Sequence, residues 1–510
     1  MLQMSQPTST LPTLRADWRG WVALVVLMLP VLLVSVDNTV LSFALPAIAL
    51  DLEPTSIEQL WIIDAYPLVL AGLLVTMGTL GDRFGRRKML LLGATGFGVV
   101  SALAAFAPTA SLLILARALL GVFGAMLMPS TLSLLRTIFR DRDQRRIAIA
   151  IWASGFSAGS ALGPIVGGLL LEHFAWGSVF LLAVPVLIPL LILGPLLVPE
   201  SRDPSPGRAD PLSILLSLGT MIPIVYGIKE LAVHGVVSIA PVMFVLGVAV
   251  GVLFVRRQLR LETPMLDMSL FRQGTFSGAI VVNLLSVVGL VGFLYFAAQH
   301  LQLVVGLPPM QAGLALVPGL VAMIASGLLV VPIAKRFPAR IVVPAALLFS
   351  VVAYAVVAFA AGNLPVLIAA FAALGIGIGA AETVSNELIL SSAPSAKSGA
   401  ASAVSETAYE LGAVLGTAIL GGILTALYRA GLVIPPGVPD AAADAARETL
   451  AGAVAAASAL PPDVGAALHE AAAHAFDSGV VVTALIGAGL IVVAGVVAAA
   501  SLGGSRGAKS

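Results

Sequence analysis

Gly78-Thr-Leu-Gly-Asp-Arg-Phe-Gly-Arg-Arg-Lys-Met-Leu90 is a short polar segment between two long apolar runs. Its single acid, Asp82, lies among four bases, Arg83, Arg86, Arg87 and Lys88. A break this short predicts a tight turn at a membrane face, and clustered bases favour the cytoplasmic face. One acid among several bases also suggests a part of the protein that moves.

Composition assigns the chain to the polytopic membrane proteins. Of its 510 residues, 59% are hydrophobic and only 10% are charged, which is more apolar sequence than a water-soluble core could bury. The absence of Cys excludes disulfides, thiolate metal sites and cysteine nucleophiles. No GxxxxGK[ST] loop, HExxH segment or catalytic Ser–His arrangement stands out. We therefore expect neither an enzyme nor an ATP-driven pump, and no cofactor or metal, which leaves protons as the coupling ion.

The apolar runs predict an all-α integral membrane protein with fourteen spans, because about 20 apolar residues cross the hydrocarbon. The expected ranges are 21–45, 58–80, 89–107, 111–135, 146–171, 177–198, 211–230, 238–256, 275–299, 311–334, 340–360, 364–391, 400–426 and 478–501. With both termini inside, all but four of the 27 Lys and Arg fall on the inner side or in inner loops. The exceptions are Lys229, Arg429 and Arg447 outside, and Arg117 within a span.

The two ends of the chain repeat each other. A shift of 253 residues lays Arg83-Phe84 and Arg87 on Arg336-Phe337 and Arg340, and the same shift aligns a set of glycines. Those glycines are Gly159, Gly163 and Gly168 on Gly412, Gly416 and Gly421. The repeat predicts two six-span bundles around a central cavity, with two inserted spans between them. The expected units are a cytoplasmic N-terminus (1–20), a first bundle (21–200), the inserted pair (201–260), a second bundle (261–501) and a cytoplasmic tail (502–510).

Four motifs resemble one family of transporters. Asp82-Arg-Phe-Gly-Arg-Arg-Lys88 resembles the signature loop of the major facilitator superfamily, and Gly155 to Gly168, GFSAGSALGPIVGG, resembles its antiporter motif. With Asp37 to Pro46 and Arg117 to Gly124, they are similar to the fourteen-span drug:proton antiporters, particularly actinobacterial exporters of quinolones, dyes and quaternary ammonium biocides. The resemblance implies the major facilitator fold and a proton-coupled exporter.

Residues of the opening segment form a candidate gating loop. Asp82 lies where a neighbouring helix terminus or an Arg could bind it while the cavity is closed on the inner side. Such charge pairs can favour one of two helix arrangements over the other. Simple retention of the loop inside by its bases is the alternative, and it would suffice for Arg86, Arg87 and Lys88. The candidate residues are Gly78, Gly81, Asp82, Arg83, Gly85, Arg86 and Arg87.

Span five carries a face of small residues. Gly155, Gly159, Gly163 and Gly167 recur every four residues, so they line one side of a helix that another helix can approach closely. Pro164 adds a bend, and Gly168 completes the motif. The family resemblance implies that this contact seals the cavity and suppresses leak, whereas the residues alone predict a packing face.

Charges within the spans are the candidate coupling and substrate residues, because a charge at mid-bilayer costs about 2.5–3.5 kcal/mol. Asp37 in span one is the strongest, since one carboxylate can hold a proton or a cation but not comfortably both. Asn38 and Thr39 could orient it or make routine helix contacts. Glu406 and Glu410 in span thirteen share a helix face, being four residues apart, and Glu382 and Glu387 in span twelve rank after them.

Two further charges each have a structural alternative. Asp64 in span two could line an outer vestibule or be a helix-end acid. The resemblance gives Arg117 in span four a part in proton transfer, and a buried structural ion pair is its alternative.

The Ala-rich segment 427–477 is expected outside, either as a helical hairpin, split at Pro461-Pro-Asp463, that caps the outer mouth, or as a solvated linker.

These features together predict a proton-coupled multidrug efflux antiporter in a bacterial plasma membrane. Its cargo would be lipophilic, often cationic small molecules, exchanged for protons by alternating access. Nothing indicates a nucleic-acid partner, membrane lipid is the expected surrounding, and a monomer is expected. A transporter of a lipid or metabolite is the first alternative, and a membrane sensor that transports nothing is the second.

Overall fold

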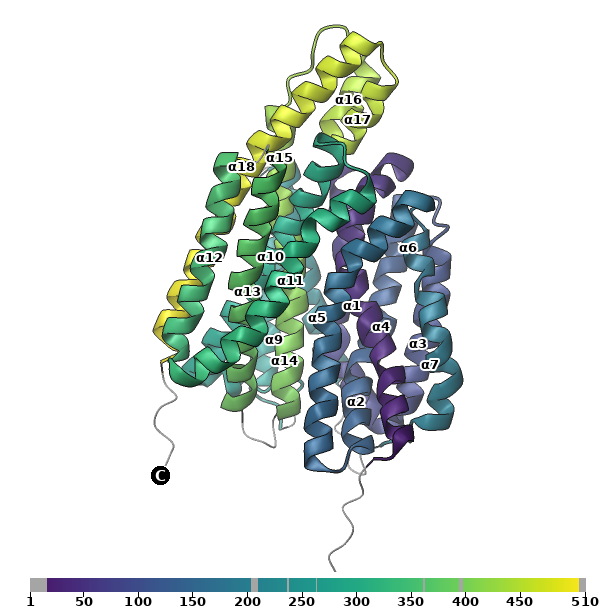
Figure 1. The fold of residues 1–510 in the computed structure, drawn as a ribbon, viewed down its shortest axis with the longest axis vertical. Coiled ribbons are helices and arrows are strands. Elements are labelled where there is room, and N and C mark those ends of the chain that lie inside the picture. The colour runs from purple at the N-terminus through teal and green to yellow at the C-terminus, as the bar shows by residue number, and fades with distance from the viewer. Residues whose placement is uncertain are drawn as a thin grey trace, which may run out of the picture.

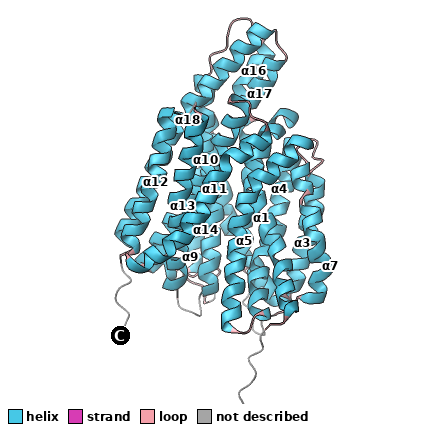
Figure 2. Ribbon diagram, viewed as in Figure 1, coloured by secondary structure: helices cyan, strands magenta, loops and turns pink. Residues whose placement is uncertain are grey.

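The computed structural model describes residues 16–202, 210–235, 238–262, 264–360, 363–393 and 398–503. Every regular element in these ranges is a helix (Figure 2). Most of the expected terminal segments 1–20 and 502–510, and residues 203–209 of the expected inserted pair, lie outside the described residues. The elements are α1 (Trp18–Leu52), α2 (Ser56–Phe84), α3 (Arg86–Ala104), α4 (Ala110–Ile138), α5 (Arg142–His173), α6 (Ser178–Leu181), α7 (Ala183–Leu197), α8 (Pro211–His234), α9 (Ala240–Gln258), η1 (Leu270–Arg272), α10 (Gly274–Gln299), η2 (His300–Val304), α11 (Pro309–Arg336), α12 (Ala339–Ala360), α13 (Leu364–Ser392), α14 (Ser398–Leu415), η4 (Gly416–Gly421), α15 (Gly422–Gly431), α16 (Asp440–Glu448), α17 (Leu450–Ser458) and α18 (Pro462–Ser501).

The predicted spans all correspond to helices. Among the described residues, 13 helical stretches are long and apolar enough to cross a membrane. The remaining predicted span, 146–171, falls on α5, whose 32 residues extend about 48 Å. Two spans are composite, because α6 and α7 together fill 177–198, and α14, η4 and α15 together fill 400–426.

The turn between α2 and α3 is shorter than the sequence predicted. Its polar residues belong to the two helices, and Gly85 alone separates them, with a φ of 114°. This backbone conformation strains any residue with a side chain. A Cβ at Gly85 would also lie 2.7 Å from the carboxyl carbon of Glu200. Glycine is therefore required at this position for two independent reasons.

The helices form two groups with a helical projection at one end (Figure 1). One group contains α1 to α7, and the other contains α10 to α15 with the long α18, which packs on α10, α12 and α15. The α2–α3 turn lies at one end of the molecule, here called the motif end, where α1 begins and α18 ends (Figure 1). Helices α16 and α17 lie at the opposite end, here called the hairpin end.

The inserted helices α8 and α9 pack against each other, and α8 also contacts α2 and α15. Asp210 caps the start of α8 and binds Arg257 of α9, with Nη2 at 2.9 Å from Oδ2. The hydrogen bonds from Arg257 lower the pKa of Asp210 to about 2. The pair therefore stays ionised at neutral pH and joins the two inserted helices near the motif end.

The segment 427–477 is folded, and the solvated-linker alternative is wrong. It contains the end of α15, then α16, α17 and the start of α18 up to Asp477, with the break before Pro462 that the sequence predicted. A second break at Thr449, which caps α17, was not predicted. The Tyr428 hydroxyl donates to the carbonyl of Ala446 at 2.7 Å and fixes α16 on α15.

Candidate functional site

A cavity lies between the two groups of helices and encloses about 1200 Å³ of unfilled space, part of it continuous with solvent. It is bounded by α2, α4 and α5 from one group and by α10, α13 and α14 from the other. Its lining is Leu70, Leu74, Met128, Trp152, Asn283, Glu382, Thr383, Asn386, Leu390, Ser402, Ser405, Glu406, Tyr409 and Glu410. Apolar and aromatic surface with a few polar groups is the usual composition of a small-molecule site.

Three predicted acids meet in this cavity. Glu406 and Glu410 line it from one face of α14, as their spacing predicted, and Glu382 lines it from α13. Oε1 of Glu410 accepts a hydrogen bond from Nδ2 of Asn38 on α1 at 3.4 Å. Among the described residues, Glu410 Oε2 and Glu382 Oε1 have no hydrogen-bond partner, and no Lys or Arg lines the cavity. Glu387 is exposed and lies outside the lining.

A second chamber connects this cavity to the motif end. It holds about 1050 Å³ of unfilled space and shares Leu74, Ser402 and Glu406 with the first. Its far lining includes Asp82 and Arg86 of the turn motif. The site is therefore reached from the motif end in this conformation.

The hairpin end is closed by contacts between the two groups. A Cβ at Gly313 of α11 would lie 2.3 Å from the carbonyl oxygen of Pro164 on α5, so the two backbones touch. Nε2 of Gln302 in η2 donates to the carbonyl of Phe43 in α1 at 3.1 Å. The carboxylate of Glu448, at the end of α16, accepts from the backbone N–H of Ser56 at 2.9 Å. These contacts agree with the expectation that the hairpin of segment 427–477 caps the outer mouth of the cavity.

Asp37 is held by Arg117. Arg117 Nη1 lies 2.6 Å from Asp37 Oδ2, and the guanidinium also donates to the carbonyls of Ile62 and Ile63. The guanidinium also lies over the aromatic ring of Tyr66, with Cζ of Arg117 4.7 Å from the ring centroid. Asp37 of span one and Arg117 of span four, both candidate coupling residues, thus form one ion pair beside the glutamate cavity. The adjacent Asn38 connects this pair to Glu410.

Asp64 and Lys229 lie where the sequence did not place them. Asp64 is neither in an outer vestibule nor at a helix end, because it is fully buried and lies inside α2. Lys229, predicted outside, is fully buried in α8, and its Nζ lies 2.9 Å from Asp64 Oδ2. The prediction failed because α8 continues to His234, past the expected end of that span.

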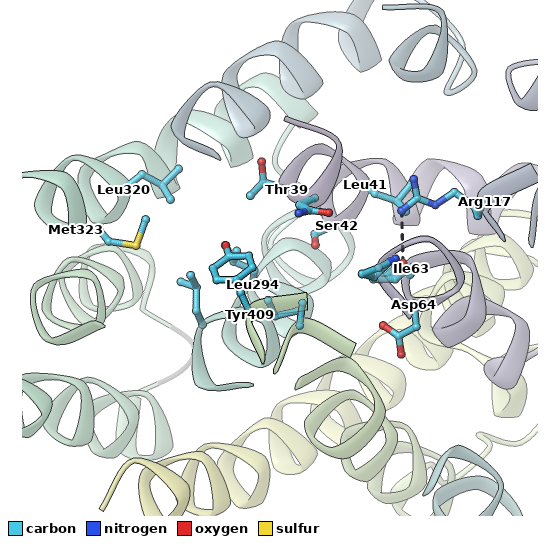
Figure 3. A pocket seen from close by; sticks show the side chains of 15 residues that line it. Thr39, Leu41, Ser42, Ile63, Asp64, Arg117, Leu294, Leu320, Met323 and Tyr409 are labelled. Atoms are coloured by element: carbon cyan, nitrogen blue, oxygen red, sulfur yellow. Dashed lines mark hydrogen bonds between the residues drawn. The ribbon is translucent and has the colours of Figure 1, made fainter. Parts of the chain in front are cut away.

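A small cavity adjoins both ion pairs. Its lining includes Asn38, Thr39, Asp64, Arg117 and Tyr409. Figure 3 shows Arg117 and Asp64 on one side of it, with Leu320 and Met323 across from them. The two ion pairs are therefore close enough to influence each other.

In the turn motif, Asp82 binds within its own segment. Its Oδ1 lies 2.6 Å from Nη2 of Arg86, one helical turn later. Arg87 is held by the first group, its N–H donating to Glu200 and its Nη1 to the carbonyl of Val198. Arg83 is exposed and lies over the ring of Phe84. Because the motif end is open here, the predicted contact of Asp82 in the closed state stays a prediction.

The span-five glycines pack against α1. A Cβ at Gly159 would lie 2.8 Å from the carbonyl oxygen of Leu32, and one at Gly163 would lie 3.1 Å from the N atom of Val40. Gly155 and Gly167 meet side chains of α1, and Gly168 meets the backbone of Met310 on α11. The aligned Gly412 and Gly416 pack against α10 in the same way, 2.8 Å from carbonyl oxygens. The predicted close helix approach is confirmed, with α1 as the partner.

We expect Gly159→Ala to destabilise the protein by about 1–3 kcal/mol, because the added methyl overpacks the α1–α5 contact. The midpoint of thermal unfolding of the purified protein should fall by several degrees. Gly495→Ala in α18 is the control, since its Cβ would meet no atom within 4 Å. An unchanged midpoint for Gly159→Ala would mean that α1 and α5 are not in tight contact.

Sequence reasoning missed a pair of amide side chains in the cavity. Asn283 Nδ2 donates to Asn386 Oδ1 at 2.8 Å, and this amide pair joins α10 to α13 beside the acids. Asn283 is an amide within a long apolar run, so the cost of an unpaired polar group in a membrane was the available signal. Asn386 had no such signal, because it lies close to the end of its span.

The fold and the central cavity define a multi-pass membrane transporter. Residues 27–417 match the Major Facilitator Superfamily. The chain is 57% identical to the multidrug efflux pump LfrA of Mycolicibacterium smegmatis, over 95% of this chain and 97% of that protein. It is 38% identical to the methyl viologen resistance protein SmvA of Salmonella typhimurium, over 90% and 93% of the two chains.

Two further comparisons agree. The chain is 31% identical to a tetracenomycin C resistance and export protein of Streptomyces glaucescens, over 97% of this chain and 94% of that one. The crystal structure of a bacterial homolog of the human lysosomal transporter Spinster, in an inward-facing and unoccupied conformation, superposes with a TM-score of 0.65. That structure is 18% identical, with 94% and 98% of the two chains covered, and supports the fold alone. The chain belongs to the major facilitator superfamily, as the motifs predicted.

Proposed function

We propose that this transporter exports lipophilic, often cationic compounds, including dyes, quaternary ammonium biocides and fluoroquinolones, in exchange for protons. The observation that carries the proposal is the central cavity, in which Glu382, Glu406 and Glu410 meet aromatic and apolar side chains and no Lys or Arg is among the described lining residues. Uncompensated carboxylates attract cations, and aromatic faces such as Trp152 bind them. The names of two relatives, a multidrug efflux pump and a methyl viologen resistance protein, support the proposal.

In the proposed cycle the motif end faces the cytoplasm of a bacterium, with both chain termini on that side. A cation enters past Asp82 and binds between the glutamates, which release their protons to water at the motif end. The two groups of helices then rock, so that the motif end closes and the hairpin end opens. Protons from outside neutralise the acids and displace the cargo. The protein works as a monomer surrounded by lipid.

The test is proton release from the purified protein in weakly buffered detergent solution when ethidium, a cationic dye, is added. We expect protons to appear in proportion to the dye bound, as measured by a pH indicator and by dye fluorescence. Glu406→Gln should release fewer protons per dye. Binding of ethidium without any proton release would overturn proton exchange, and no binding of ethidium would favour a lipid or metabolite as cargo.

A further inference from the structure

The ion pair between Lys229 and Asp64 has no place in the cycle above. Both side chains have zero exposure, and Nζ also donates to the carbonyl of Leu60 at 3.0 Å and lies 3.9 Å from the ring centroid of Trp61. All three partners of the ammonium group are residues of α2, whereas Lys229 itself belongs to the inserted helix α8. The inserted helices therefore contribute a charge to the first group of helices.

An apolar cluster packs beside the pair. Leu68, Val225, Val414 and Ala418 form a small buried cluster of their own, joining α2, α8, α14 and η4. Replacing a buried ion pair by apolar residues of similar volume is often neutral or stabilising, so stability does not account for two charges in this position. Ionisable groups within a membrane span are functional candidates for the same reason.

The pair lies on the seam between the two groups of helices. A Cβ at Gly72 of α2 would lie 2.3 Å from Cδ2 of Leu218 on α8, and one at Gly422 of α15 would lie 2.9 Å from Cβ of Ala232 on α8. Helix α8 thus touches both groups, and Thr417 of η4 lies close to the Asp64 carboxylate. A rocking motion that separates α2 from η4 must change what surrounds Asp64.

Asp64 is also connected to the pair Asp37–Arg117. Arg117 donates to the carbonyls of Ile62 and Ile63, directly before Asp64, so its movement is transmitted to the backbone of α2. Figure 3 shows Arg117 and Asp64 on opposite sides of Ile63. The charged and titratable groups that face Asp64 are Lys229 from α8, Arg117 from α4 and Tyr295 from α10.

We propose that Asp64 is a second proton-exchange site, and that Lys229 is its positioning residue, a tethered cation that takes the place of the proton in the conformation described here. When the hairpin end opens, a proton from water binds the Asp64 carboxylate and replaces the ammonium group. Lys229 keeps its own proton and its contacts with Leu60 and Trp61. On return to the present conformation Asp64 releases its proton to the motif end and binds Lys229 again.

This inference rests on the proposed proton exchange and adds the inserted helix to it. It makes α8 a working part of the transporter, although α8 lies outside the internal repeat. It also explains why two charges are retained beside an apolar cluster. The Asp64 carboxylate binds the ammonium group of Lys229 in one conformation and a proton in the other, and apolar side chains could bind neither.

The experiment compares Lys229→Met, Asp64→Asn and the double variant with the native protein. Protons released per ethidium bound are measured in detergent from acidic to alkaline pH, together with efflux driven by a pH gradient in proteoliposomes. We expect both single variants to lose the same pH-dependent step of proton release. The double variant carries no buried charge at this position, so it should unfold at a temperature at least as high as native and still lack the step. Lys335→Met, which changes an exposed Lys in the last turn of α11, is the control and should behave as native.

The outcomes separate this inference from the proposed function. If the native protein releases no protons when it binds ethidium, the proposed function fails first. If native release is intact but the double variant regains full proton release and efflux, the pair is only structural and this inference is wrong. If both single variants keep every step of the native profile, Asp64 exchanges no proton and the inference is also wrong.

Discussion

Asp37→Asn is expected to abolish efflux driven by a pH gradient. The substitution removes an exchangeable carboxylate and leaves Arg117, which is 1% exposed, as an unpaired buried cation. Because the carboxylate that exchanges the proton is gone, we expect transport below about 1% of the native rate, and breaking such a buried pair should also lower the stability by about 3–5 kcal/mol. The measurement is ethidium efflux from proteoliposomes with an imposed pH gradient.

The control for this prediction is the double variant Asp37→Asn with Arg117→Gln. It has no unpaired buried charge, so its thermal unfolding midpoint should return toward the native value. Efflux should not return, because the carboxylate is still missing. Native rates of pH-driven efflux in Asp37→Asn would exclude a part for this acid in coupling.

Glu410→Gln should lower proton-driven efflux by about tenfold or more, because the amide cannot exchange a proton and its bond from Asn38 loses the charge that makes such a bond contribute about 1.5–3 kcal/mol. Glu410 is 4% exposed, and its bond from Asn38 connects α14 of one group to α1 of the other. The variant keeps that bond through its amide oxygen but cannot exchange a proton. Proton release per bound dye should therefore fall while the protein remains folded.

Glu387→Gln is the matched control for Glu410→Gln. It is the same change in a span-twelve acid that is exposed and outside the cavity lining. It should leave both efflux and proton release at native values. Equal losses in the two variants would indicate a general effect of negative charge rather than a site at Glu410.

Local patterns in the sequence were sufficient for much of the fold. Apolar runs located the membrane helices, and the four-residue glycine spacing predicted the face of α5 that now packs on α1. The same spacing argument placed Glu406 and Glu410 on one side of α14. These features depend on residues within one helix, where periodicity fixes direction.

Contacts between distant helices could not be predicted in this way. The pairing of Lys229 with Asp64 joins an inserted helix to the first bundle, and only the packing of α8 against α2 brings the two together. The pairing of Asp37 with Arg117 was open for the same reason. The turn at Gly85 was missed for another reason. The charged residues of the motif were interpreted as a loop, whereas they continue α2 and α3 up to either side of Gly85.

Glu406 lines both the inner cavity and the chamber at the motif end. A cargo that arrives by this route passes Glu406 before it reaches the more deeply buried Glu410. Charges near an entrance mainly set association rates, whereas buried charge contacts mainly set dissociation rates. We therefore expect the two acids, one helical turn apart on α14, to act at different moments: Glu406 should set how often a cargo is captured, and Glu410 how long it stays bound.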